Sequence, residues 1–326
     1  MSLPSFQLLR PKTLGEALAM LAKHPGEVKI VAGGTDLLPS MKQKLFMPPY
    51  VLDLRSVAEL RGIRSLPGNG VEIGALTTLS TIEHSALIRK DYPVLQAAAK
   101  TVASPVLRNM GTIGGNICLD TRCLWYNQSL LWRKSCGFCL KKDGDLCHVA
   151  PGGNFCWATF SGDTPPALLC LGAEIEIAGS DVVRRTPLSE FYVNDGIARL
   201  HLGINEIVTR VFLPESAAGW RGNYQKLRVR GSIDYPLAGV AVALKMKSGR
   251  VEDARAAITA LNPAPHLLKD VDARLIGTLP GEEIAEAIGE LAASTAKPLT
   301  TSALTPEYRR EMVRVLAKRA MMACAN

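Results

Sequence analysis

The sequence predicts an α+β protein built from three folding units, with a cysteine-rich loop inserted into the second unit. The chain of 326 residues is long enough for several domains, and its hydrophobic content of 47% is typical of domains with buried cores. Helical and strand-like patterns alternate along most of the chain, but residues 121–158 show neither period. Six of the eight cysteines lie between Cys118 and Cys156. A loop of that length needs an internal source of binding energy to stay ordered, so we expect a metal centre there.

The first unit, residues 1–57, is predicted to be a small α/β unit. Thr13 and Glu16 have the spacing of a capping box, which begins a helix that ends near Pro25. Strands are predicted at residues 28–32 and 50–54. The earlier strand runs directly into a glycine-rich loop.

The second unit, residues 58–219, contains the insert. A strand at residues 71–75 precedes a helix for which Ser80 and Glu83 form the predicted cap, and a further helix is expected at residues 93–102. The remaining strand-like segments of this unit are residues 166–170, 173–177 and 206–211.

The third unit, residues 220–326, is predicted to combine strands with a long C-terminal helix. Residues 237–246 have the apolar pattern of a strand. Thr305 is the predicted cap of the last helix, with Pro306 in its first position. The expected apolar side of that helix consists of Tyr308, Met312, Val315 and Leu316.

Charge and hydropathy exclude two classes of function. The net charge of +8 is spread along the chain with no basic stripe interleaved with aromatic residues, so nucleic-acid binding is not predicted. An acidic partner or a face that docks other subunits explains the charge better. No apolar run approaches the ~20 residues that span a bilayer, and the N-terminus lacks the pattern of a secretion signal. We expect a cytoplasmic protein that does not enter membranes, in which clustered thiols serve as metal ligands and not as disulfides.

Two loops are rich in glycine: residues 33–35 read Gly-Gly-Thr and residues 114–116 read Gly-Gly-Asn. Without a Cβ, such loops let backbone N–H groups approach an anion closely, and together they could hold a pyrophosphate. Neither fits Gly-x-Gly-x-x-Gly or Gly-x-x-x-x-Gly-Lys-Ser/Thr, so a Rossmann dinucleotide site and a P-loop are not supported. Taken singly, each Gly-Gly pair is also compatible with an ordinary turn.

The amino-acid sequence around both loops resembles that of a known family. Residues 29–38 and 112–117 are similar to the two flavin loops of the flavoprotein subunits of molybdenum hydroxylases, the xanthine dehydrogenase and carbon monoxide dehydrogenase family. Residues 161–166 resemble the Ser-x-Asp-x-x-Pro motif that follows in that family, and the similarity continues through residues 224–230 and 308–310. The resemblance implies a two-subdomain FAD-binding domain of the PCMH type, formed by the first two units. It also implies a C-terminal α+β domain of the CO dehydrogenase flavoprotein type.

The same resemblance implies one non-covalently bound FAD. The positions implied to contact it are Ile30, Val31, Ala32, Gly33, Gly34, Thr35, Asp36, Leu37, Thr77, Gly111, Thr112, Ile113, Gly114, Gly115, Asn116, Asp163, Ile207 and Lys226. For Ile207 a core position remains an alternative, and for Lys226 a surface charge does. No acid, base or nucleophile is predicted to be catalytic in this chain.

The cysteines of the insert suit either zinc or an iron–sulfur cluster. Only Cys136 and Cys139 have the Cys-x-x-Cys spacing of a zinc ribbon, and the wide spacing of the others favours a cluster. Spacing alone would pair Cys136 with Cys139 as ligands. Outside the insert, Cys170 is expected in a core and Cys324 at a helix end.

An insert at this place resembles that of the flavoprotein subunits of 4-hydroxybenzoyl-CoA reductases, which carry an additional [4Fe–4S] cluster. The resemblance assigns the ligands to Cys123, Cys139, Cys147 and Cys156 and leaves Cys136 as an alternative to Cys123.

This resemblance implies an electron-transfer subunit of a molybdenum enzyme that reduces 4-hydroxybenzoyl-CoA to benzoyl-CoA. The implied partners are a molybdopterin-binding large subunit and a [2Fe–2S] small subunit in a dimer of heterotrimers, with ferredoxin as electron donor. Basic residues of the insert are expected to form a docking surface for ferredoxin: Arg122, Arg133, Lys134, Lys141 and Lys142.

Three alternatives stay open at this point. The first is the subunit of an NAD-linked molybdenum hydroxylase, with a structural zinc or cluster in the insert. The second is a self-contained flavin oxidase, and the third is a non-redox assembly subunit that binds zinc.

Overall fold

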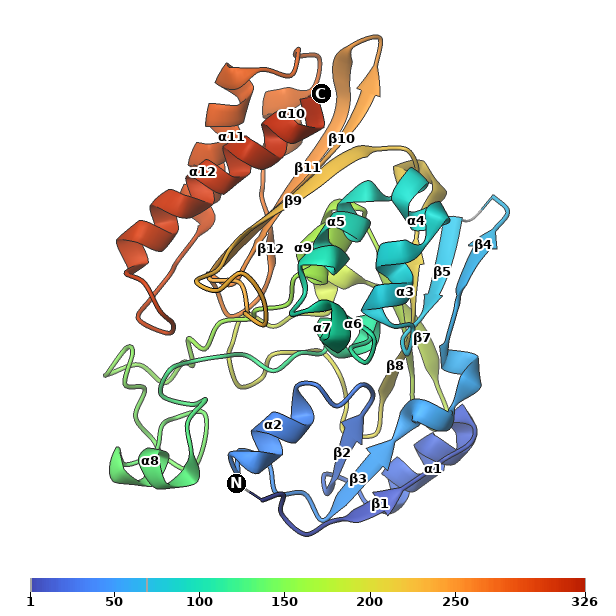
Figure 1. Ribbon diagram of the computed structural model, residues 1–326, viewed down its shortest axis with the longest axis vertical. Helices are drawn as coiled ribbons and strands as arrows, with labels where there is room; N and C mark the ends of the chain where they lie inside the picture. Colours follow the sequence, from blue (N-terminus) through green and yellow to red (C-terminus); the bar gives the residue numbers. More distant parts are fainter. Residues whose placement is uncertain (1, 69, 326) are drawn as a thin grey trace.

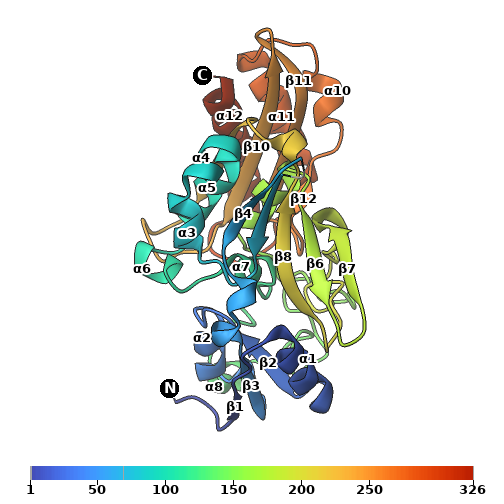
Figure 2. The ribbon, with the colours of Figure 1, turned by 90° about the vertical axis from the view of Figure 1, so that its right-hand side faces the viewer.

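The computed structural model describes residues 2–68 and 70–325, which form three sheets stacked along the long axis of the molecule (Figures 1 and 2). Figure 2 shows the N-terminal sheet below and the C-terminal sheet above the middle one. The expected α+β fold is confirmed.

The N-terminal sheet is parallel, with strand order β1-β3-β2. Its elements are β1 (Gln7–Leu9), α1 (Leu14–Lys23), β2 (Val28–Val31), α2 (Leu37–Lys42) and β3 (Tyr50–Asp53). The predicted cap is confirmed, since Glu16 N–H donates to Thr13 Oγ1 at 3.2 Å. Helix α1 buries Ala17, Leu18 and Leu21 against the sheet, which fixes the position of the loop after β2.

The middle sheet is antiparallel, with order β4-β5-β8-β6-β7, and helices cover one of its faces. Two 3-10 turns lead into it, η1 (Leu54–Ser56) and η2 (Ala58–Leu60). Its strands are β4 (Ile63–Leu66), β5 (Gly70–Gly74), β6 (Glu174–Ala178), β7 (Val183–Pro187) and β8 (Ile207–Leu213). Its helices are α3 (Leu79–His84), α4 (Ala86–Asp91), α5 (Pro93–Thr101), α6 (Pro105–Arg108), α7 (Ile113–Ile117) and α9 (Thr164–Cys170).

Two expectations for this region are wrong. Residues 166–170 belong to helix α9 and are not a strand, because Pro165 and Pro166 occupy the first turn, where an N–H is not needed. The cap of α3 is Thr78 and not Ser80, since Thr81 N–H donates to Thr78 Oγ1 at 3.1 Å.

The C-terminal sheet is antiparallel, with order β12-β11-β10-β9. Two further 3-10 turns, η3 (Leu188–Glu190) and η4 (Glu215–Ala217), precede it in the chain. Its elements are β9 (Arg221–Leu227), β10 (Ala238–Lys247), β11 (Arg250–Thr259), β12 (His266–Leu267), α10 (Val271–Leu275), α11 (Glu282–Thr295) and α12 (Pro306–Ala325).

Strand β10 is apolar on both faces because both faces of this sheet are covered. Ala241 and Ala243 pack toward α5 and α9 of the middle unit, whereas Val240 and Val242 pack toward α11 and α12. One hydrophobic core therefore runs from the middle sheet into the C-terminal sheet.

Helix α12 begins as predicted, since Tyr308 N–H donates to Thr305 Oγ1 at 3.2 Å. Its expected apolar side is correct at Leu316, which is buried, but not at Tyr308, Met312 and Val315. Tyr308 is 48% exposed, and the buried stripe starts at the neighbouring Arg309. The stripe continues at helical spacing through Val313, Leu316, Ala317, Ala320, Met321 and Cys324. The helical spacing of the buried residues was not evident from the sequence, because the first buried position is a charged residue, Arg309.

The cysteine-rich insert leaves the fold and returns to it at one place. Arg122 N–H donates to Thr159 O and Thr159 N–H donates to Arg122 O, both at 2.7 Å. Between them the chain is mostly loop, as expected, but it includes the short helix α8 (Leu130–Ser135), which was not. Figure 1 shows the insert beside α2, and its Tyr126 and Cys139 pack on Leu45 of the N-terminal unit.

Candidate functional site

The two glycine loops meet each other in space. A Cβ added at Gly33 would overlap the Met110 carbonyl oxygen, so only glycine allows this approach. Between the loops lies a pocket with about 320 Å³ of empty volume, part of it open to solvent. Its lining residues are Ala32, Gly33, Arg55, Arg61, Leu76, Thr78, Asn109, Met110 and Thr112.

The two loops differ in the backbone donors that they offer. In the described part of the chain, the N–H groups of residues 33–36 donate no hydrogen bond. The N–H groups of the second loop are used internally: Ile113 donates to Thr77 O, Gly114 to Ala75 O, Gly115 to Thr112 Oγ1 and Asn116 to Thr112 O. In the described part of the two loops, the amide donors without an acceptor are therefore those of residues 33–36 and of Thr112, and such donors bind anions well.

Two arginines of this pocket were missed by the sequence analysis. Arg55 forms a bidentate ion pair with Asp53, at 2.9 Å from Nε and 2.7 Å from Nη2, and these bonds lower the pKa of Asp53. Arg61 is exposed and forms no ion pair within residues 2–68 and 70–325. An unpaired cation beside free amides fits a diphosphate, whose oxygens are anionic. No local motif marks these arginines, which lie just after β3.

Several predicted FAD positions support the structure of the site and do not line the pocket. Thr77 donates to Gly62 O at 3.0 Å and accepts from Gly62 N at 2.9 Å, so its neighbour Thr78 lines the pocket instead. Ile30 and Val31 lie in β2, and Leu37 begins α2. Ile207 is 3% exposed in the core at the start of β8.

A second group of predicted positions joins the middle and C-terminal units. Asn116 Oδ1 accepts from Thr164 N at 3.0 Å, which connects the second loop to the motif beyond the insert. Asp163 accepts from Tyr224 Oη at 2.7 Å and from Lys226 Nζ at 2.9 Å. Burial raises the pKa of Asp163, and the facing Lys226 opposes that rise. The Lys226 side chain is 3% exposed, so the surface-charge alternative is wrong, and neither residue lines the glycine-loop pocket.

Asp36 connects three parts of the molecule. Its carboxylate forms an ion pair with Arg122 of the insert and accepts from Tyr235 Oη at 2.9 Å. Arg122 Nη2 also donates to Tyr235 Oη at 2.8 Å. The first glycine loop is thus tied to both the insert and the C-terminal unit.

Four cysteines of the insert surround a second pocket, with about 310 Å³ of empty volume. These are Cys123, Cys139, Cys147 and Cys156, whereas Cys136 is not among the lining residues. Aromatic rings complete the walls, contributed by Trp125, Tyr126, His148 and Trp157. Among the described residues, no three His, Cys, Asp or Glu side chains converge closely enough to hold a single metal ion.

The pocket thiols affect one another. Burial raises the pKa of Cys123 to about 11, and the nearby Cys139 and Cys156 contribute. Burial likewise raises the pKa of Cys156, with a contribution from Cys147. Positive charge from a bound metal acts in the opposite sense and favours the thiolates. Outside the pocket, Cys170 is buried in a hydrophobic core, as expected. Cys324 lies near the end of α12, as expected, but it is also buried in the C-terminal core.

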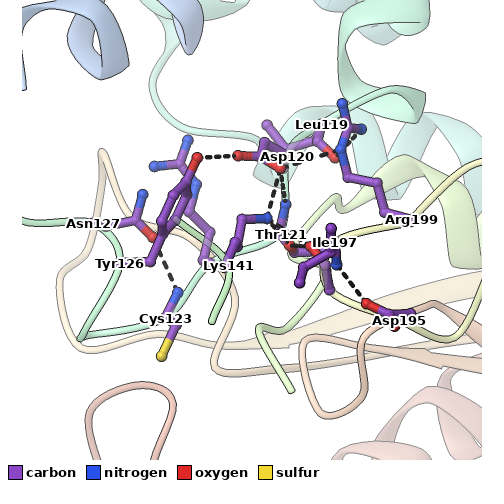
Figure 3. A network of polar contacts seen from close by, with 12 residues as sticks. Leu119, Asp120, Thr121, Cys123, Tyr126, Asn127, Lys141, Asp195, Ile197 and Arg199 are labelled. Atoms are coloured by element: carbon purple, nitrogen blue, oxygen red, sulfur yellow. Dashed lines mark hydrogen bonds and ion pairs between the residues drawn. The ribbon is translucent and has the colours of Figure 1, made fainter. Parts of the chain in front are cut away.

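A polar network adjoins the thiol pocket through Tyr126 and Lys141, which line it, and Figure 3 shows this network. Asp120 accepts from Tyr126 Oη at 2.9 Å and from Lys141 Nζ at 2.9 Å, and Arg199 Nε lies 3.2 Å from it. Burial acts to raise the pKa of Asp120, but Lys141 and Arg199 outweigh burial and lower it. The carboxylate is therefore held in its charged form.

The expected docking surface for ferredoxin is wrong, because three of its five basic residues are turned into the fold. The Arg133 side chain is 1% exposed and donates to Lys44 O at 2.9 Å. The Lys141 side chain is 7% exposed, and Arg122 is paired with Asp36. These cations hold the insert against the rest of the molecule.

Comparison with known proteins agrees with this architecture. Residues 4–216 match the family described as "FAD binding domain in molybdopterin dehydrogenase", and residues 223–324 match "CO dehydrogenase flavoprotein C-terminal domain". The chain belongs to the FAD-binding subunits of the molybdenum hydroxylase family. It is thus an FAD-binding electron-transfer subunit of an oxidoreductase.

Individual relatives are similar over their full length. The carbon monoxide dehydrogenase medium chain of Hydrogenophaga pseudoflava is 29% identical, over 98% of this chain and 97% of the relative. The nicotine 6-hydroxylase medium subunit of Paenarthrobacter nicotinovorans is 28% identical, over 99% and 98%. The solved structure of reconstituted CO dehydrogenase from Oligotropha carboxidovorans has a TM-score of 0.81 at 27% identity, over 100% of this chain and 99% of that one.

No helix of residues 2–68 and 70–325 combines the length and the apolar character that crossing a bilayer requires.

Proposed function

We propose that this chain is the FAD- and [4Fe–4S]-carrying electron-transfer subunit of a molybdenum-containing 4-hydroxybenzoyl-CoA reductase. That cytoplasmic enzyme would remove the phenolic hydroxyl reductively and form benzoyl-CoA. The observation that carries the proposal is that four thiols of one insert line a single pocket beside the FAD-binding unit. Substrate would bind on a molybdopterin-binding large subunit, and a [2Fe–2S] small subunit would connect the two, in a dimer of heterotrimers.

For FAD, we propose that the diphosphate occupies the pocket between the glycine loops. Free N–H groups of residues 33–36 and the exposed Arg61 support this assignment, because both favour anionic oxygen. In the second loop, Thr112 would contribute to the wall, while residues 113–116 keep the loop in shape through their own hydrogen bonds. Thr77, Asp163 and Lys226 would act by holding the site together.

For the cluster, we propose Cys123, Cys139, Cys147 and Cys156 as ligands, because these four share the pocket and Cys136 does not. A cluster bound there accepts one electron at low potential, and a flavin stores two, so the pair would collect electrons for the molybdenum site. Removal of an aromatic hydroxyl requires a strong reductant, which favours ferredoxin as donor. The choice of ferredoxin therefore rests on the strong reductant that the reaction requires and not on a basic docking surface.

The second candidate is an NAD-linked molybdenum hydroxylase subunit with a structural zinc or cluster in the insert. The similarity to the nicotine 6-hydroxylase medium subunit favours the hydroxylase part of this alternative. Under this alternative NADH would bleach the flavin, whereas under the first proposal reduced ferredoxin would bleach it and NADH would not.

The deciding experiment is cofactor analysis of the anaerobically purified complex and of this chain expressed alone. We expect the single chain to contain one FAD with about four iron and about four acid-labile sulfide. The complex should convert 4-hydroxybenzoyl-CoA to benzoyl-CoA with reduced ferredoxin. One zinc without sulfide would contradict the cluster, and an intact cluster without turnover of this substrate would contradict the reductase assignment alone.

A further inference from the structure

We propose that Lys141 is a positioning residue whose ammonium group stabilises the more negative, reduced state of the metal group held by the pocket thiols. The inference rests on the proposed function, because it requires a redox-active group in the pocket. It assigns to one buried cation the control of the potential at which electrons enter the chain.

Lys141 combines two properties: it lines the thiol pocket, and its charged end is fixed. Its Nζ donates to Asp120 Oδ1 at 2.9 Å, to Gly196 O at 2.7 Å and to Thr121 Oγ1 (Figure 3). An ammonium group has three donors, so all of them are used. The same Nζ lies 4.7 Å from the ring centre of Tyr126, which also lines the pocket.

The anchor of Lys141 is in direct contact with a pocket thiol. A Cβ added at Gly196 would lie 2.6 Å from Cys156 Sγ, and Gly196 N–H donates to Cys156 O at 2.8 Å. The residue whose carbonyl oxygen accepts from Lys141 is therefore the residue on which the Cys156 sulfur packs. Gly196 therefore contacts both groups: its carbonyl oxygen accepts from the Lys141 ammonium, and its Cα lies against the Cys156 sulfur.

Charges around Asp120 do not cancel. Asp120 faces two cations, Lys141 and Arg199, and Lys29 adds a third positive charge nearby. Asp195, which acts on Cys156, adds a second negative charge, so one positive charge remains in excess beside the pocket. The Lys141 side chain is 7% exposed, so water screens this charge only weakly.

A metal group ligated by four thiolates is anionic, and each added electron makes it more so. A fixed positive charge nearby stabilises the reduced state more than the oxidised state and raises the reduction potential. Removal of the Lys141 charge should therefore make the bound metal group harder to reduce.

The neighbouring residue provides a matched control. Lys142 lies one position along the chain, is paired with Asp143 at 3.0 Å, has a 35% exposed side chain and does not line the pocket. Lys142→Met removes the same formal charge from the same loop without changing the pocket wall. Asp120→Asn tests the sign, because it removes the negative charge that partly offsets Lys141 and keeps an acceptor oxygen.

The experiment is an anaerobic dithionite titration of the full chain, followed by electron paramagnetic resonance, with iron, sulfide and FAD measured in each sample. For Lys141→Met we expect the reduction equilibrium of the cluster to become about tenfold less favourable, which is a shift of about 59 mV to more negative potential for one electron. We expect no shift in Lys142→Met and a shift to more positive potential in Asp120→Asn.

Each other outcome overturns a defined part of the proposal. Equal potentials in Lys141→Met and the unsubstituted chain, at equal iron and sulfide, would reject the role of Lys141 and leave the proposed function standing. An unsubstituted chain without iron and sulfide would reject both. If Lys141→Met loses the cluster, Lys141→Arg decides: a retained cluster with an unshifted potential supports the charge, and loss in both variants rejects an electrostatic role in favour of a structural one.

Discussion

At the scale of single residues, glycines at close contacts define both candidate sites. Gly33 lies against the carbonyl group of Met110, and Gly196 lies against the sulfur of Cys156. One contact joins the two flavin loops, and the other shapes the thiol pocket. Each can be tested by the addition of a single methyl group.

Gly33→Ala should separate the two glycine loops, because its Cβ has no room beside Met110 O. We expect a folded protein depleted of FAD that keeps its iron and sulfide, measured by flavin absorbance and by metal analysis. Gly15→Ala is the control, since its Cβ in helix α1 would meet no atom closer than 4.0 Å. Stoichiometric FAD in Gly33→Ala would show that the loops need not touch.

Gly196→Ala should have the reverse effect. Its Cβ would lie 2.6 Å from Cys156 Sγ and would displace that thiol. We expect loss of iron and sulfide with FAD retained. Gly231→Ala, where no atom lies within 4 Å of the added Cβ, should change neither cofactor. Retention of a full cluster in Gly196→Ala would argue against Cys156 as a ligand.

Arg61→Ala should weaken FAD binding by about tenfold or more, since a hydrogen bond to a charged group contributes roughly 1.5–3 kcal/mol. Titration of the flavin-free protein with FAD, followed by fluorescence, measures the change. Arg64 is paired with Glu72 at 2.7 Å and does not line the pocket, so Arg64→Ala should bind FAD normally. Equal affinities in the two variants would contradict the diphosphate assignment.

At the scale of secondary structure, local sequence patterns predicted helices and strands correctly where intrinsic propensity and burial agree. The capping box at Thr13 and the strand in residues 237–246 were both evident from the sequence. Prediction failed for residues 166–170, because their apolar run suits a buried strand and a buried helix equally. It failed for most of the buried face of α12, because the first buried position is an arginine.

Arg309 illustrates why such a position is not evident locally. Its guanidinium donates to the carbonyl oxygens of Leu237, Leu299 and Ala260 at 2.9, 3.0 and 2.6 Å, and these partners lie 72, 10 and 49 residues away in sequence. Burial lowers its pKa to about 10. Arg309→Met should leave three carbonyl groups without their donor and reduce the free energy of unfolding by about 2–4 kcal/mol.

Denaturant unfolding checks the Arg309 prediction. The neighbouring Arg310 is exposed, so Arg310→Met is the matched control and should change stability by less than about 0.5 kcal/mol. Equal stability of the two variants would mean that water replaces the guanidinium at no cost.

At the scale of the whole molecule, the sequence predicted three units and an insert but not the contacts between them. Arg122 and Lys141 read as surface charges in the sequence, yet their partners Asp36 and Asp120 turn them inward. Arg55 and Arg61 carried no signal at all, because only the fold brings them to the glycine loops. Contacts of this kind depend on tertiary structure and not on any local pattern.

Replacement of residues 124–157 by a short Gly-Ser link should preserve the FAD site, because the backbones of Arg122 and Thr159 already pair. The link retains Arg122 and hence its ion pair with Asp36. We expect bound FAD that small artificial donors reduce, while reduction by ferredoxin is lost, followed by stopped-flow absorbance. Unchanged rates with ferredoxin would leave the insert with a structural role.

The double covering of strand β10 has a consequence for biosynthesis. Helices α5 and α9 cannot complete their packing until residues 238–259 have been made, and that sheet in turn awaits α12 at the end of the chain. A nascent chain whose residues 306–325 have not yet emerged from the ribosome would therefore expose apolar surface from two units at once. We expect this polypeptide to need chaperones until those residues have emerged, and to receive its cofactors only after that.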